Sequence, residues 1–357
     1  MEIDITKKIE LAQQTNELQL IQEFLKNYHL EQIGKLYNLT TLELYDCIIL
    51  HNKLEFLSNL LQLQNLDLSF SKLTDMDLVY LKPLKNLIYL NLCQNPINGI
   101  GFIDMCFDKV KTLDMMRTNL SIDGVIAITK CFSSLETFIY YKGNNEFNED
   151  CLMYLCKECK YLKDIHLCDV DILDYSSLVL CPTLESISIH YTEQPSNYIA
   201  YPDIRPEINN KYADMTIPIL SNIKSLTLCR ELSEQIMGQI QLYSSIENLC
   251  IRSLDNNFIN SNIVLLKNLK KLTIHAYLQN NNLEFLLYMP QLEELDLRFN
   301  HDLNNNVLDY FINLSNLKSL NVYETKITSQ FLNIYKKYFS NNCKIYSGLS
   351  DDDSVSE

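Results

Sequence analysis

One short apolar motif recurs along most of this chain and restricts its fold more than any other feature. The segment Leu63-Gln-Asn-Leu66-Asp-Leu68 returns as Leu87-Ile-Tyr-Leu90-Asn-Leu92, with the same spacing of leucines. Copies of the motif start at Leu39, Leu63, Leu87, Val110, Leu135, Leu162, Leu184, Ile223, Ile246, Leu269, Leu292 and Leu317. Ten of the eleven intervals between successive starts are 22–27 residues long. A repeat of this period predicts a solenoid, in which each unit packs against its neighbours.

The motif itself predicts a strand, a turn and a helical connection. Leucines two residues apart point to the same face of a strand, so the LxL part is expected to bury one face. A small or polar side chain then occupies a turn position. In the different repeats, this position is Cys47, Ser71, Asn95, Thr118, Thr192, Asn300 or Thr325. The residues that follow have helical spacing, as in 75–81 and 123–128. The 37 Asn residues, a tenth of the chain, are therefore expected mostly in turns and connections rather than in disorder.

Repeat counting favours one elongated solenoid over the two ordinary domains that 357 residues would suggest. Residues 1–38 are expected to form an N-terminal cap of one or two amphipathic helices. Residues 39–346 form the repeats, with an insertion at about 194–215 that is rich in Pro and Tyr. The insertion has two interpretations, a functional loop or a neutral insertion or decayed repeat. The acidic tail, 347–357, is expected to be disordered.

These repeats resemble the leucine-rich repeat family, and the resemblance covers about residues 36–346. It implies an α/β fold, a horseshoe-shaped solenoid of about 12 repeats with a parallel β-sheet on the concave side and helices or turns on the convex side. Some units, such as the one at Cys159-Lys-Tyr-Leu162, resemble the cysteine-containing subtype of F-box proteins. Others resemble bacterial repeats of 23–24 residues. Residues 1–38 lack the apolar pattern of an F-box.

Composition excludes several classes of function. A formal charge of −15 without a basic block argues against nucleic-acid binding, and only 7 Gly with no GxGxxG or GxxxxGK leave no phosphate loop. No secretory signal or membrane span is visible, so the 12 Cys are interpreted as reduced thiols of a cytoplasmic protein. We expect no cofactor and no membrane association. A non-classical secretion route into a host cytosol is the alternative location.

Strand alternation identifies the side chains that the concave face would expose. Acidic positions such as Glu43, Asp67 and Asp114 gather towards the N-terminal repeats, and Arg and Lys gather towards the C-terminal repeats. Tyr and Arg are common energetic centres of protein interfaces. The predicted partner-binding residues are Tyr141, His166, His190, Tyr191, Tyr198, Tyr201, Arg230, Arg252, His275 and Arg298. The competing interpretation is a solvated polar surface without a partner.

Three patterns resemble chemical sites. Cys168, His190 and Cys229 share a column across three units, but a row of ligands on a flat sheet fits tetrahedral zinc poorly, so no metal site is predicted. Cys156-Lys-Glu-Cys159 lacks the second pair or the thioredoxin-like context that a redox or metal role needs, which favours buried packing. A Cys168–His190 dyad lacks an orienting third group. We therefore predict no catalytic residue and no enzyme activity.

The sequence thus predicts a non-catalytic protein–protein interaction scaffold or adaptor, a monomer whose concave face binds a partner protein. Asn, Ile, Lys and Tyr are frequent in this chain, and their codons are rich in A and T. This bias would suit the genome of an intracellular pathogen, so the protein could be an effector that such a pathogen delivers into a host cell. The alternative is the substrate-recognition subunit of a ubiquitin ligase complex that docks through residues 1–38 instead of an F-box.

Overall fold

The structure is a computed structural model, and it describes residues 4–49, 54–141, 146–170, 172–190, 216–228, 238–252, 261–276 and 278–348. Within these ranges only the backbone of His190, Arg252 and Ser261 is described. The chain divides into two compact units, Met1–Leu184 and Glu185–Glu357. The expected insertion at 194–215, the acidic tail beyond residue 348 and the turn residue Thr192 lie outside the described residues.

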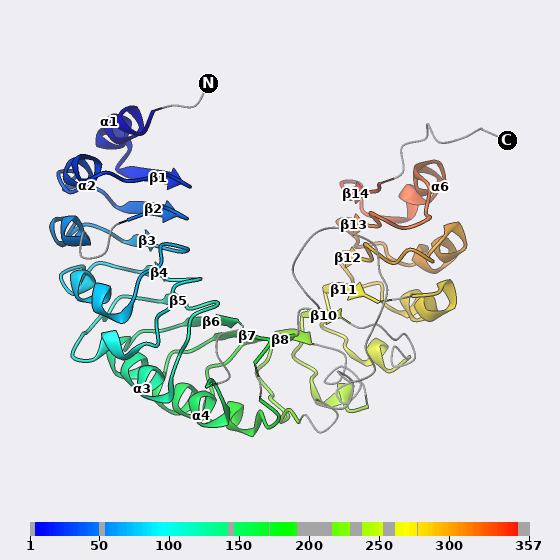
Figure 1. Cartoon of the computed structure of the whole chain (residues 1–357). Helices are drawn as coiled ribbons and strands as arrows, with labels where there is room; N and C mark the ends of the chain where they lie inside the picture. The colour runs from blue at the N-terminus through cyan, green and yellow to red at the C-terminus, as the bar shows by residue number, and fades with distance from the viewer. Residues whose placement is uncertain are drawn as a thin grey trace. The chain divides into compact units, whose positions relative to one another are not determined.

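In the first unit, short parallel strands follow one another in chain order (Figure 1). They are β1 (Glu17–Ile21), β2 (Thr41–Tyr45), β3 (Asn65–Asp67), β4 (Tyr89–Asn91), β5 (Thr112–Asp114), β6 (Thr137–Tyr141) and β7 (Asp164–Cys168). Equivalent leucines lie in register, with Leu18 opposite Leu42, and Leu66 opposite both Leu42 and Leu90. These side chains are buried, because each unit covers the leucine stripe of the next.

The second unit repeats the arrangement. Its strands are β8 (Ser186–His190), β9 (Ser225–Leu228), β10 (Asn248–Arg252), β11 (Lys271–His275), β12 (Glu294–Asp296), β13 (Ser319–Asn321) and β14 (Lys344–Tyr346). Strands β8 and β9 pair directly, with Ser186 opposite Ser225, although the repeat interval between them is 39 residues. No strand therefore lies between these two neighbours.

Helices cover one side of the strands in both units (Figure 1). The α-helices are α1 (Ile5–Thr15), α2 (Asn27–Ile33), α3 (Ile122–Cys131), α4 (Glu149–Glu158) and α6 (Ser329–Tyr335). The 3₁₀ helices are η1 (Leu54–Asn59), η2 (Asp75–Leu81), η3 (Ile100–Phe102), η4 (Ser176–Leu180), η5 (Ile240–Leu242), η6 (Ser261–Leu265), η7 (Asn280–Tyr288), η8 (Asn305–Phe311) and η9 (Lys336–Tyr338). The expected α/β architecture, a parallel sheet with helices and turns along one side, is confirmed. Among the described residues, no helix has the length and apolar content needed to cross a membrane.

The expected turn positions are confirmed where the structure describes them. Asn95 is buried, and its amide group donates to the carbonyls of Leu68 and Leu92 at 2.9 Å. Its Oδ1 accepts from the backbone N–H groups of Ser71 at 3.1 Å and Leu73 at 2.9 Å. One side chain thus satisfies backbone groups of two successive repeats, and this bonding fixes how the repeats stack.

The N-terminal cap differs from the prediction in one respect. Residues 17–21 form β1, which pairs with β2 over its full length, so the sheet begins one strand earlier than expected. The apolar residues Leu18 and Leu20 are buried, whereas Glu17, Gln19 and Ile21 are exposed. This alternation has the period of a strand, and the helical interpretation of this segment is wrong. Helices α1 and α2 flank the strand.

A row of charges before the strands was not predicted. Glu136 binds Lys111 and Lys163, each at 2.7 Å. The same position in later units gives the pairs Glu185–Lys224, Glu247–Lys270 and Glu293–Lys318, at 2.6–2.8 Å. Exposed pairs of this kind stabilise a fold weakly. Because the sign alternates along the row, each acid lies beside a lysine of a neighbouring repeat rather than beside a like charge.

Candidate functional site

Polar and basic side chains meet at the carboxyl ends of β11–β13 in the second unit. His275 ends β11 and contacts Arg298, which follows β12, and Tyr323 follows β13. We call these three residues, His275, Arg298 and Tyr323, the C-terminal ridge. In the register of β10 and β11, the backbone of Arg252 lies opposite His275. The regular pairing of neighbouring strands brings the ridge together although its first and last residues are 48 residues apart in the sequence.

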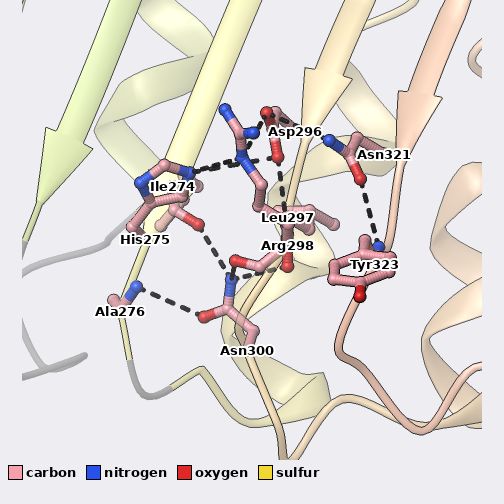
Figure 2. A network of polar contacts seen from close by, with 9 residues as sticks. All are labelled: Ile274, His275, Ala276, Asp296, Leu297, Arg298, Asn300, Asn321 and Tyr323. Carbon is pink, nitrogen blue, oxygen red and sulfur yellow. Dashed lines mark hydrogen bonds and ion pairs between the residues drawn. The ribbon is translucent and has the colours of Figure 1, made fainter. Parts of the chain in front are cut away.

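Asp296 orients the guanidinium group of Arg298 (Figure 2). The Arg298 Nε lies 3.1 Å from Asp296 Oδ2 and 3.4 Å from His275 Nε2. The Asp296 Oδ1 also accepts the backbone N–H of Arg298 at 3.1 Å, and Asn321 Nδ2 lies 3.4 Å from Oδ2. The Arg298 side chain remains 43% exposed. The guanidinium group is therefore oriented by its neighbours and still accessible to an anionic group.

Asn300 fixes the turn beneath the ridge in the same way as Asn95 in the first unit (Figure 2). It is fully buried, and its amide group donates to the carbonyls of Ile274 and Leu297, both at 2.8 Å. Its Oδ1 accepts from the N–H groups of Ala276 and Leu278 at 3.3 Å. The backbone on both sides of His275 and Arg298 is thus tied to one buried side chain.

Two exposed aromatic rings, that of Tyr323 in the ridge and that of Phe299 beside it, lie on this surface. Phe299 has a φ of 65°, and this left-handed turn directs its ring between the neighbouring strand ends. Its centroid lies 6.3 Å from the His275 ring and 6.2 Å from the Tyr323 ring, both edge-on. Phe299 and Tyr323 are both exposed. Rigid aromatic rings beside an oriented Arg are typical of protein-binding surfaces.

A shallow hollow of about 340 Å³ adjoins the ridge on the same face of β9–β14. Its wall contains Thr227, Cys250, Thr273, Asp296 and Asn321, which occupy equivalent positions of neighbouring strands. Polar and apolar groups line the hollow in about equal measure. It widens the accessible surface on this face of the second unit.

The structure brings together only part of the predicted site. His275 and Arg298 touch, whereas Tyr191, Tyr198, Tyr201 and Arg230 lie outside the described residues, and His190 and Arg252 are described only in their backbone. Tyr141 was expected to be exposed, and this is wrong. It is only 6% exposed, and the Arg117 guanidinium carbon lies 5.3 Å from the centre of its ring. His166 is half-buried, and burial lowers the pKa of its imidazole.

Charges on the sheet are more balanced than the sequence suggested. Lys271 pairs with Glu294 at 2.7 Å, and Arg298 with Asp296 at 3.1 Å. Each of these two cations therefore has an acid beside it on the same face. On the first unit, burial and the neighbouring charge of Asp67 raise the pKa of Asp114 to about 6. Sequence reasoning missed Phe299, although its place before the turn residue Asn300 was a usable signal.

The cysteine patterns behave as packing groups. Cys156 and Cys159 are buried, and burial raises the pKa of both thiols, to about 12 for Cys159, so they stay protonated. Cys168 is also buried. Among the residues that the structure describes, no three His, Cys, Asp or Glu side chains gather as metal ligands would. Cys229 and the His190 side chain lie outside that part of the chain.

Comparison with known proteins gave matches among solved structures. No protein-family model matches the chain, and no curated protein matches it in sequence. An internalin from Listeria monocytogenes superposes over 98% of this chain and 96% of its own, with a TM-score of 0.53 and 19% identity. A leucine-rich-repeat protein of Leptospira interrogans has a TM-score of 0.40 and 17% identity, covering 94% of this chain and 97% of its own. TLR13, in a complex with ssRNA13, has a TM-score of 0.42 and 18% identity over 97% of this chain and 59% of its own.

The internalin superposition, the parallel strands in chain order and the turn-forming Asn95 and Asn300 support the same assignment. The chain has the fold of a leucine-rich-repeat protein.

Proposed function

We propose that the chain is a non-catalytic protein-interaction scaffold, and that its C-terminal ridge binds an acidic segment of a partner protein. The observation that carries this proposal is the Arg298 guanidinium, oriented by Asp296 and His275 yet 43% exposed, with the exposed ring of Phe299 packed edge-on against His275. An oriented cation can bind a carboxylate without first losing much conformational freedom. The aromatic rings supply apolar contact area beside it.

The shape of the surface supports a macromolecular partner. The ridge and the hollow extend over strands β9–β14 on one face of the second unit. This surface is broad and shallow, whereas sites for small molecules are usually concave and mostly apolar. A peptide or a protein surface makes contact along such a face more readily.

The test is peptide binding by matched charge-reversal variants. The probe is an immobilised peptide rich in Glu with one Phe, and a Lys-rich peptide of equal length is the control ligand. Arg298→Glu should weaken binding of the acidic probe roughly tenfold, or about 1.4 kcal/mol. Lys318→Glu is the matched control, because Lys318 is an exposed cation 2.6 Å from Glu293 and precedes β13, at the opposite end of the strands from the ridge. Equal binding by both variants would contradict the proposal.

The location in a host cell and the ubiquitin-ligase role stay predictions from the sequence. One observation bears on the second. Strand β1 continues the sheet in register with β2, and Thr40 Oγ1 donates to the Asn16 carbonyl at 3.1 Å. This integration favours a role for the N-terminal segment in capping the solenoid over a role as a separate docking helix.

A further inference from the structure

A second exposed surface lies in the first unit, at the carboxyl ends of β1–β3. Its members are apolar side chains of three successive repeats, Ile21, Phe24, Tyr45, Ile48 and Phe70, and we call them the N-terminal apolar patch. The first four are between 39% and 55% exposed, and Phe70 is half-buried. Contiguous exposed apolar side chains are uncommon on proteins without a partner at that place.

The patch is continuous across the strands. Ile21 lies opposite Tyr45 in the register of β1 and β2, and Phe24 lies opposite Ile48 in an isolated parallel bridge. The ring of Tyr45 lies 5.0 Å from the ring of Phe70, centre to centre. Because backbone pairing places four of these side chains, the patch is rigid. A partner would meet a preformed surface.

The neighbouring concave positions carry acids and no base. Glu17, Glu43 and Asp67 lie on β1, β2 and β3, and no Lys or Arg occupies a concave position of these three strands. Cations border the patch along the chain: Lys26 follows Phe24 by two residues, Lys72 follows Phe70 by two residues, and Lys8 pairs with Glu23 at 3.4 Å. When a partner covers the apolar patch, the polar side chains around its own apolar face would therefore lie against these acids. Charge complementarity calls for a cationic partner.

The dimensions fit a helix. Three neighbouring strands span about 10 Å across the sheet, since strands lie about 4.8 Å apart. Apolar residues at positions i and i+7 of a helix are also about 10 Å apart along its axis. An amphipathic helix can therefore set two turns of apolar side chains on the patch, with basic side chains towards Glu43 and Asp67.

We propose that the N-terminal apolar patch docks a cationic amphipathic helix of a partner protein. This site is separate from the C-terminal ridge, and its ligand has the opposite charge. It adds a second binding surface to the scaffold and does not depend on the ridge.

The test uses the full chain and a defined helical peptide of leucine and lysine, with leucines at i, i+3, i+4 and i+7. A scrambled peptide of the same composition and a leucine–glutamate peptide are the control ligands. Ile48→Ser should weaken binding of the Leu/Lys helix about tenfold, and Glu43→Gln should weaken it and reduce its dependence on salt. Leu61→Ser and Glu55→Lys, which change exposed residues outside the patch, should leave binding unchanged.

Several outcomes would overturn the proposal. They are equal binding of the helical and scrambled peptides, equal binding of the lysine and glutamate helices, or equal losses in Leu61→Ser and Ile48→Ser. The protein could instead bind vesicles of neutral lipid and fail to bind the Leu/Lys helix. If Ile48→Ser abolished this vesicle binding, the patch would be assigned to a membrane surface. Thermal unfolding checks that each variant is folded. If Ile48→Ser is unstable, the binding of Glu43→Gln decides the test. Arg298→Glu should bind the helix as the wild type does, which separates this result from that of the ridge.

Discussion

Replacement of Asn300 by Ala should destabilise the second unit and loosen the ridge. Asn300 is fully buried and bonds backbone groups on both sides of His275 and Arg298. An alanine leaves the N–H groups of Ala276 and Leu278 without their acceptor. It also removes the donors to the Ile274 and Leu297 carbonyls.

The size of the effect follows from these groups. A buried donor or acceptor that loses its partner costs about 1–3 kcal/mol, and the costs of neighbouring groups do not add fully because the turn can relax. We therefore expect Asn300→Ala to lower the free energy of unfolding by about 2–4 kcal/mol. Asn300→Thr should recover part of this loss, since Thr325 in the next repeat bonds the Val322 carbonyl at 2.7 Å from the same position.

The assay combines urea unfolding with hydrogen exchange and peptide binding. Hydrogen exchange should show faster exchange of the Ala276 and Leu278 amides in Asn300→Ala. Asn95→Ala is the matched variant, because Asn95 makes equivalent bonds in the first unit. Both variants should lose similar stability, but only Asn300→Ala should weaken binding of the acidic peptide to the ridge. A loss below about 1 kcal/mol, or unchanged protection of both amides, would refute this account of the turn.

Three further predictions concern the first unit. Gly124→Ala should destabilise the fold by about 1–3 kcal/mol in urea unfolding, because an added Cβ would clash with the backbone oxygen of Asn98; wild-type stability would contradict this close approach. Asp114→Asn should stabilise the protein at pH 7.5 by roughly 1–3 kcal/mol but not at pH 4, as urea midpoints at both pH values would show. The sign follows because the folded pKa of about 6 exceeds the ordinary value of 3.8, so the wild type loses stability as pH rises through this range, whereas Asn cannot ionise. Deletion of residues 1–30 removes α1 and β1 and should unfold the first repeats in circular dichroism; a fully folded product would favour a separate docking role.

The sequence by itself determined the repeat, the direction of the strands and most of the buried surface. Leucines at a fixed period have one way to be buried together, which is to stack successive units with parallel strands. The turn role of Asn95 and Asn300 also followed from the motif. Strand β1 was missed because Leu18 and Leu20 lie among residues that also fit a helical pattern, and only pairing with β2 decides between the two periods.

The tertiary structure decided which polar side chains act together. Strand alternation placed Tyr141 on the exposed face, but the cation–π contact with Arg117 comes from the preceding repeat and could not be read from one motif. Likewise, His275, Asp296 and Arg298 come from adjacent repeats, and their contacts depend on register and rotamer. The sequence fixes periodic burial because burial depends on a pattern within each repeat. The surfaces that could bind partners depend on contacts between repeats, which only the folded chain sets.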